Sequence, residues 1–257
     1  MSDILLVENR GRVRILTLNR PGAKNAFNDD LYDAVREALT AAADDHDVAV
    51  VVITGSPGAF SAGQDLSEMG NLPAHDDGLP HGFAPFIDVM QAFPKPLMAA
   101  VNGVAVGIGV TMLLHCDIVL VADGIRLRAP FVSLGIATEA GSSALFPARM
   151  GWQNTAHMLF TSSFIDAEQA VAVGLAWRRS PADRLMADTL EVADAIATMP
   201  VSSLVENKRL LLDARLPAVI EARRREDAAL ARMVGSPANR EAIAAFMQKR
   251  APDFSNL

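Results

Sequence analysis

The sequence predicts a mixed α/β fold, and three of its features support this class. Apolar runs with the length of buried strands alternate with helical patterns in the first half of the chain. Beyond Gly151 nearly every segment has helical spacing and begins near a capping residue or a proline. Of the 257 residues, 51% are hydrophobic, which is ample for a sizeable core.

A β-hairpin and a helix are the first elements predicted. The strands 4–7 and 12–18 flank the turn signal Asn9-Arg10-Gly11. Asn28 then caps a helix, and a buried strand follows over 48–54. The helix has apolar residues at helical spacing and an acidic pair in its first turn: Leu31, Val35, Ala38, Leu39 and Ala42, and Asp29 and Asp30.

Two turns rich in glycine follow buried strands, and each precedes a helical pattern. The first runs over 55–66 and the second follows a strand at 96–101, opening a helix that ends near His115. The first amides of a helix lack partners within it, so such a turn can hold negative charge on a ligand oxygen. We expect the two turns to face each other, although the second alone is equally compatible with an ordinary buried connection. Their glycines are Gly55, Gly58 and Gly63, and Gly107 and Gly109.

Composition excludes several classes of function. The net charge of −7 disfavours a nucleic-acid partner, and neither glycine turn matches a nucleotide-binding motif. The lone Cys116 excludes an internal disulfide and is expected to be buried and inert. No apolar run reaches about 18 residues and no leader pattern is present, so we expect a cytoplasmic protein without a membrane partner. His75 and His81, beside Asp76 and Asp77, lack a third spaced ligand group, so no metal is expected.

The second half of the chain is predicted to be helical. Arg223, Arg224 and Arg225 stand among Glu221, Glu226 and Asp227, which is typical of an exposed face with salt bridges. We expect Trp152, Phe160 and Phe164 in the core or in a subunit interface. The predicted helices are 83–93, 152–161, 166–173, 183–199, 201–213, 217–234 and 237–249, with one short strand at 175–179.

Four segments, in this order, resemble the enoyl-CoA hydratase/isomerase (crotonase) family: NRPGAKNAFN, GSPGAFSAGQDLSEM, KPLMAAVNGVAVGIGVTMLLHCDIVLVAD and APFVSLGIATEAGSSALFPARMG. The ending FMQKRAPDF is similar to that family's usual ending.

This resemblance implies a spiral of ββα units over residues 1–195 and a helical C-terminal region over 196–257. The latter would form a homotrimer or a dimer of trimers. It also implies an acyl-CoA thioester substrate of fatty acid metabolism, with coenzyme A as part of the substrate and no separate cofactor.

The family motifs also imply roles for individual residues. The backbone amides of Gln64 and Ile108 would form an oxyanion hole for the thioester oxygen, which is worth a large share of a rate enhancement. Coenzyme A would contact Lys24, Ala26, Ala62, Asp65 and Leu66. The acyl pocket would contain Phe86, Met90, Thr111 and Phe131.

The acid and base residues indicate which reaction to expect. Hydratases of the family use two glutamates, and their positions here hold Thr111 and Phe131, neither of which replaces a carboxylate as a base. Glu139, in LGIATEAGSSALFP, resembles the single catalytic glutamate of the isomerases, with Thr138 in place of their usual proline. We therefore expect isomerisation of 3-enoyl-CoA to trans-2-enoyl-CoA.

Three alternatives stay open from the sequence. Glu139 could serve only the dipole of the helix that follows it. The chain could be a divergent hydratase, or another acyl-CoA lyase or hydrolase. It could also be a non-catalytic, RNA-binding crotonase relative, which its acidic charge disfavours.

Overall fold

The computed structural model describes residues 3–65 and 79–257. Its main sheet has six strands in the order β1-β2-β3-β4-β6-β8. The first two form the predicted antiparallel hairpin, and every other neighbouring pair is parallel. The strands are β1 (Leu5–Arg10), β2 (Val13–Leu18), β3 (Val50–Gly55), β4 (Leu97–Val101), β6 (Ile118–Ala122) and β8 (Arg178–Ser180).

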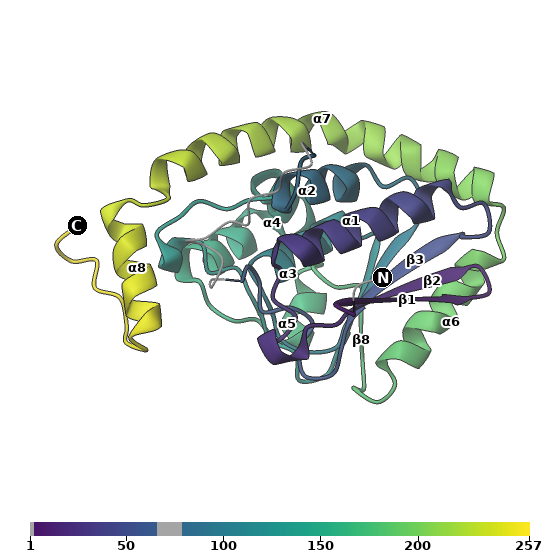
Figure 1. The fold of residues 1–257 in the computed structure, drawn as a ribbon, viewed down its shortest axis with the longest axis horizontal. Helices are drawn as coiled ribbons and strands as arrows, with labels where there is room; N and C mark the ends of the chain where they lie inside the picture. The colour runs from purple at the N-terminus through teal and green to yellow at the C-terminus, as the bar shows by residue number, and fades with distance from the viewer. Residues whose placement is uncertain (1–2, 66–78) are drawn as a thin grey trace.

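The central strands are buried on both faces. Every residue of β3 and β4 is buried, as their continuous apolar sequences predict. On one side of the sheet lie α1 (Asp29–Asp44) and α2 (Phe83–Ala92), and on the other lies α6 (Leu185–Ala197) (Figure 1). The carboxyl ends of β3 and β4 lead into the two glycine turns.

The first helix forms as its sequence predicts. The Asn28 side chain accepts a hydrogen bond from the Leu31 amide, a cap worth about 1 kcal/mol. Its buried face contains Leu31, Val35, Leu39 and Ala42, at helical spacing, and also Tyr32. This face turns the Tyr32 hydroxyl toward the protein interior.

A second, two-stranded sheet lies beside the glycine turns. In it β5 (Ala105–Val106) pairs in parallel with β7 (Leu127–Arg128). The helix predicted to end near His115 is α3 (Ile108–Thr111), continued by a 3₁₀ turn, η2 (Met112–His115). Cys116, directly after it, is buried as predicted, and burial raises the pKa of its thiol to about 12.

In the second half, the strand predicted at 175–179 lies at Arg178–Ser180, and two helices differ from the prediction. The helix α4 (Ser142–Thr161) begins well before residue 152, and the chain kinks at Gly151 inside it. The predicted helices 201–213 and 217–234 form one continuous helix, α7 (Val201–Met233), with Pro217 inside. Pro217 is exposed, so water can satisfy the carbonyl that loses its helical partner.

The remaining elements are short. Asp166 forms a capping box at α5 (Ala167–Ala172), and the Ser236 side chain caps α8 (Pro237–Met247). The 3₁₀ turns η1 (Pro21–Ala23) and η3 (Val132–Leu134) precede α1 and α4. The division of the chain at residue 195 stays a prediction.

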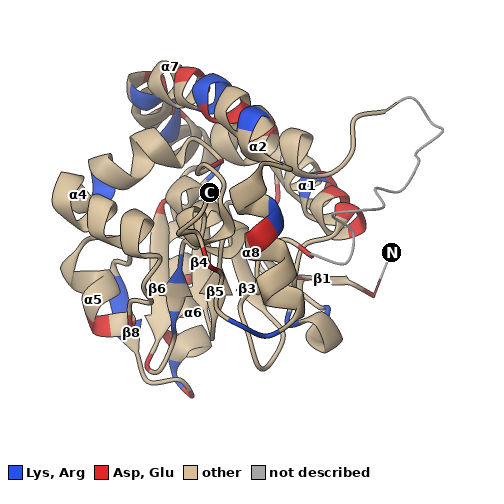
Figure 2. Cartoon of the chain, turned by 90° about the vertical axis from the view of Figure 1, so that its left-hand side faces the viewer, with Lys and Arg blue, Asp and Glu red and all other residues tan. Residues whose placement is uncertain are grey.

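The surface has two features relevant to partners. Basic and acidic residues are interspersed along α7 rather than segregated by sign (Figure 2). Trp152 and Phe160 are 75% and 71% exposed, so neither belongs to the core of this chain. Within residues 3–65 and 79–257, no helix is both long enough and apolar enough to cross a membrane.

Candidate active site

The two glycine turns touch each other, as the sequence predicts. The Val106 amide donates to the Ser61 carbonyl at 3.0 Å, and the Ser61 amide donates to the Val104 carbonyl at 3.1 Å. A β-carbon on Gly109 would lie 2.7 Å from the Ser61 carbonyl oxygen, and one on Gly63 would lie 2.8 Å from that of Val106. Only glycine permits this close approach of the two backbones.

Within residues 3–65 and 79–257, the backbone amides of Gln64 and Ile108 at this junction lack a protein partner. The amides of Gly63, Asp65 and Gly107 donate to Ser61 Oγ, to the Phe27 carbonyl and to the Arg128 carbonyl. Among the described residues, neither the Gln64 amide nor the Ile108 amide donates a hydrogen bond to protein. Ile108 is the first residue of α3, where a helix leaves its amides unsatisfied. Two donors are thus available for a ligand oxygen.

The loop 20–27 lies against the first glycine turn. The Ala62 amide donates to the Lys24 carbonyl at 2.9 Å. The Arg20 guanidinium donates to the Ala26 carbonyl at 2.5 Å and forms an ion pair with Asp65 at 3.0 Å. Four of the residues predicted to contact coenzyme A therefore lie together. The fifth, Leu66, lies outside the described residues.

The residues predicted to line an acyl pocket are all buried. Phe86 and Met90 lie on the inner face of α2, Thr111 ends α3, and Phe131 directly precedes η3. Two of the hollows on the described surface lie elsewhere, one between α1 and α2 and one beside Pro96. The lining role of these four residues stays a prediction.

Glu139 lies in the loop before α4, outside the helix itself. The residue is partly exposed, yet its carboxyl group is desolvated by the surrounding protein. Burial, and then the nearby Glu226 carboxylate, raise the pKa of Glu139 to about 7, while the Thr111 hydroxyl opposes the shift. The Thr111 hydroxyl is buried and makes no hydrogen bond of normal geometry within the described part of the chain. A carboxyl with a pKa of about 7 thus stands beside a hydroxyl that has no other partner among the described residues.

Tyr32 also belongs to this site, although the sequence analysis did not select it. Its hydroxyl donates to Gln64 Oε1 at 2.7 Å, and its ring stacks on Phe27 with the ring centres 4.8 Å apart. Burial, and then the charge of Glu139, raise the pKa of Tyr32 well above its ordinary value. The only signal in the sequence is a hydroxyl on the apolar face of a predicted helix.

Glu226 corrects the prediction of an exposed, salt-bridged face. Arg224 and Arg225 do pair with Glu221. Glu226, however, is only 4% exposed and accepts hydrogen bonds from two backbone amides. Val219, Ala222 and Glu226 share the buried face of α7, and their helical spacing was the signal that the charge run obscured.

A metal cluster is not formed by the part of the chain that the structure describes. No group of three His, Cys, Asp or Glu side chains is close enough there to hold an ion. Asp33 forms an ion pair with His81, whereas His75, Asp76 and Asp77 lie outside that part.

Comparison with known proteins identifies the family. A family model described as enoyl-CoA hydratase/isomerase matches residues 8–256. The chain belongs to this family. A crystal structure of an enoyl-CoA hydratase/isomerase from Pseudoalteromonas atlantica T6c matches with a TM-score of 0.93 and 35% identity, over 98% of this chain and all of that one. The spiral crotonase fold expected from the sequence is confirmed.

Relatives of this chain have names that describe different reactions. 2,3-Dehydroadipyl-CoA hydratase of Escherichia coli K12 is 36% identical over 97% of this chain and 98% of its own length. 1,2-Epoxyphenylacetyl-CoA isomerase of the same organism is 31% identical over 99% of both chains. Membership of the family therefore indicates an enzyme that acts on CoA thioesters, and it does not select one reaction.

Proposed function

We propose that this enzyme converts 3-enoyl-CoA to trans-2-enoyl-CoA, with Glu139 as its single acid and base. The observation that carries the proposal is the pKa of Glu139, raised to about 7. A group with a pKa near the working pH can both accept a proton and return it. Thr111 and Phe131 leave the two positions of the hydratase glutamates without a carboxylate.

In the proposed reaction the Glu139 carboxylate removes a proton from C2 of the substrate. The electron pair of the broken C2–H bond moves toward the thioester, giving a dienolate with negative charge on the carbonyl oxygen. Protonated Glu139 then delivers the same proton to C4, the double bond forms between C2 and C3, and the carbonyl is restored. Proton and electrons balance without water or a redox partner.

The dienolate needs donors for its oxygen. The Gln64 and Ile108 amides suit this role, because they lie at the contact between the two glycine turns and donate to no acceptor among the described residues. Precedent values one such donor at about 2.7–4 kcal/mol. Lys24, Ala26, Ala62 and Asp65 would hold the CoA portion beside them.

The reaction as proposed requires neither a metal nor a separate cofactor. We expect full activity after exhaustive treatment with a chelator, followed by assay in metal-free buffer. Activity that is lost on chelation and regained with an added divalent cation would overturn this part of the proposal.

Hydration is the competing function, favoured by the hydratase that is 36% identical. The two are separated by incubating the enzyme with matched 3-enoyl and 2-enoyl thioesters, resolving the isomers by chromatography and detecting hydration by mass. We expect an isomer of unchanged mass from the first, and no product heavier by one water from the second. A dominant hydrated product would reject isomerisation, and salt-sensitive binding of RNA without turnover would reject both.

The role of Glu139 is tested by Glu139→Gln, which keeps size and removes the base. We expect kcat to fall by about 10²–10⁴-fold, with CoA affinity retained. Thr111→Ala should cost far less, because threonine supplies only a hydroxyl beside the base. Glu8→Gln, on the exposed strand β1, is the matched control. A Glu139→Gln enzyme within a few-fold of wild type would show that another group moves the proton.

A further inference from the structure

The turn that carries Glu139 is held by a side chain from a distant helix. The two carboxylate oxygens of Glu226, on α7, accept hydrogen bonds from the Gly141 and Ser143 amides, each at 2.7 Å. These amides lie at the start of α4, where the helix itself offers no acceptor. Bonds from amides to a carboxylate are stronger than neutral ones. Glu226 thus clamps the backbone two and four residues after Glu139.

The clamped turn has an unusual backbone. Ala140, between Glu139 and Gly141, has a φ of +62°, a conformation that a residue with a β-carbon rarely adopts. The His115 ring donates from Nε2 to the Ala140 carbonyl at 2.8 Å. Burial lowers the pKa of His115 to about 3, so the ring is neutral. Such a conformation persists only where the surroundings hold it.

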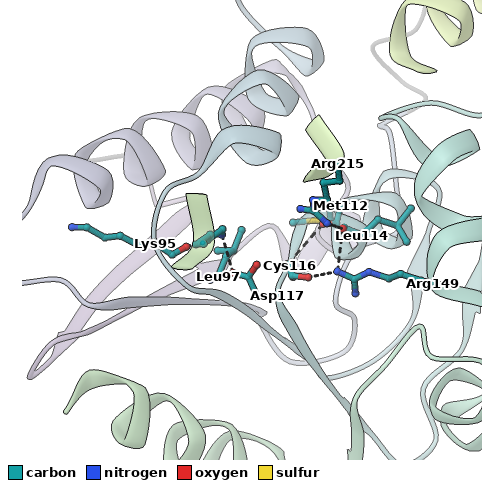
Figure 3. A network of polar contacts seen from close by, with 9 residues as sticks. Lys95, Leu97, Met112, Leu114, Cys116, Asp117, Arg149 and Arg215 are labelled. Atoms are coloured by element: carbon teal, nitrogen blue, oxygen red, sulfur yellow. Dashed lines mark hydrogen bonds and ion pairs between the residues drawn. The ribbon is translucent and has the colours of Figure 1, made fainter. Parts of the chain in front are cut away.

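The helix that presents Glu226 is itself anchored. Arg215 of α7 donates to the Leu114 carbonyl at 3.3 Å, and Arg149 of α4 donates to the carbonyls of Leu114 and Cys116 (Figure 3). Nearer the start of α7, the Lys208 ammonium forms a 2.8 Å ion pair with Asp117. α7 is therefore fixed to the segment that follows the second glycine turn.

We propose that Glu226 is a positioning residue for the proton transfer: by bridging the Gly141 and Ser143 amides, it holds the Glu139 carboxyl in its reactive place. The inference rests on the proposed function, because it assumes that Glu139 moves the proton. It assigns part of the site to α7, which the family motifs do not include.

A second consequence concerns the charge around Glu139. Among the described residues, the polar groups that interact with it are Glu226 from α7, Thr111 from α3 and Tyr32 from α1. Arg223, one turn before Glu226, forms a 2.6 Å ion pair with Asp88 on α2. Glu226 is the group among these whose charge raises the pKa of Glu139. Its carboxylate thus both places the base and makes it stronger.

Two substitutions separate these effects. Glu226→Gln keeps the length, removes the charge and leaves one acceptor oxygen for the two amides, whereas Glu226→Asp keeps the charge but is too short to bridge both amides. Glu221→Gln, on the exposed side of the same helix, removes a charge without touching the turn. The measurements are kcat and KM for 3-enoyl-CoA across pH 5–9, with circular dichroism to verify folding.

For Glu226→Asp we expect kcat to fall by about 10–100-fold, because a misplacement of about 1 Å can cost that much. KM and the acid limb of the profile of kcat against pH should not change. For Glu226→Gln we expect a lower kcat and an acid limb moved to lower pH. Glu221→Gln should match wild type. If both folded Glu226 variants keep wild-type kcat and acid limb while Glu139→Gln is inactive, this inference fails and the proposed function stands. If Glu139→Gln is itself active, the proposed function fails first.

If the Glu226→Gln chain does not fold, Glu226→Asp alone tests the positioning role. A fall in kcat with unchanged KM supports that role. An increase in KM with unchanged kcat would mean that Glu226 supports substrate binding and would overturn the positioning role.

Discussion

The Tyr32 hydroxyl donates a 2.7 Å hydrogen bond to the Gln64 side-chain oxygen, and this bond ties α1 to the first glycine turn. The Gln64 amide is one of the two proposed donors to the thioester oxygen. A bond to the side chain limits the freedom of the same residue's backbone. α1 therefore takes part in the geometry of the proposed oxyanion hole.

Removing this hydroxyl should weaken turnover without unfolding the enzyme. Tyr32→Phe keeps the ring that stacks on Phe27 and packs beside Phe86. Because a typical hydrogen bond contributes about 0.5–1.5 kcal/mol, we expect kcat/KM to fall by about 2–12-fold. The melting temperature should fall by only a few degrees, so the variant stays folded in the assay. An unchanged kcat/KM would indicate that Gln64 keeps its position unaided.

The raised pKa of Glu139 also predicts how stability varies with pH. Its ordinary value is 4.5 and its value in the folded protein is about 7, so the folded state favours the protonated form. The stability gained in this way is present below pH 4.5 and is lost as the pH rises through 7. The neutral Glu139→Gln should therefore gain stability relative to wild type between pH 5 and 8, by about 1–3 kcal/mol.

Urea unfolding of both proteins at several pH values measures this difference. Glu221→Gln is the control. Because Arg224 lowers the pKa of Glu221, removing this charge should lower the stability at neutral pH rather than raise it. A difference between Glu139→Gln and wild type that does not vary with pH would contradict the raised pKa.

The contact between the glycine turns predicts a strict size limit at Gly109. In Gly109→Ala the new methyl group would lie 2.7 Å from the Ser61 carbonyl oxygen and would push the turns apart. We expect kcat to fall by about 100-fold, since small displacements of catalytic groups have that effect. Gly22→Ala is the control, because its β-carbon meets nothing within 4 Å. Equal activities of the two variants would show that the spacing of the turns is unimportant.

Assembly into a homotrimer, or a dimer of trimers, is a further prediction. Trp152, Phe160 and Leu211 are 75%, 71% and 69% exposed in the single chain, and burial of such side chains drives association. Sedimentation velocity at micromolar concentration should give the mass of three or six chains. A single monomeric species across that range would rule this assembly out.

The sequence predicted the parts of this fold whose signals are local. The Asn28 cap and the glycine spacing around Gly63 and Gly109 each depend on residues close in the chain, and each is found in the structure. The joining of two predicted helices through Pro217 was missed, because proline usually ends a helix and only its exposure permits it here.

The candidate site likewise contains residues that local motifs predict and residues that only the fold reveals. The two turns and the position of Glu139 follow from motifs, whereas Tyr32 and Glu226 act through contacts between distant segments. A tyrosine on an apolar helix face, or a glutamate beside three arginines, has an ordinary explanation until the fold shows what it contacts. Long-range partners of this kind are not encoded in local spacing.

The clamp on the Glu139 turn also affects how this enzyme is made. Gly141 and Glu226 are 85 residues apart in the chain. While the ribosome is still synthesising that interval, the glycine turns and Glu139 already exist, but the carboxylate that holds the turn does not. A nascent chain that has passed Glu139 therefore has every group of the proposed chemistry and still lacks its geometry. Competence should arise abruptly, late in synthesis, when α7 docks.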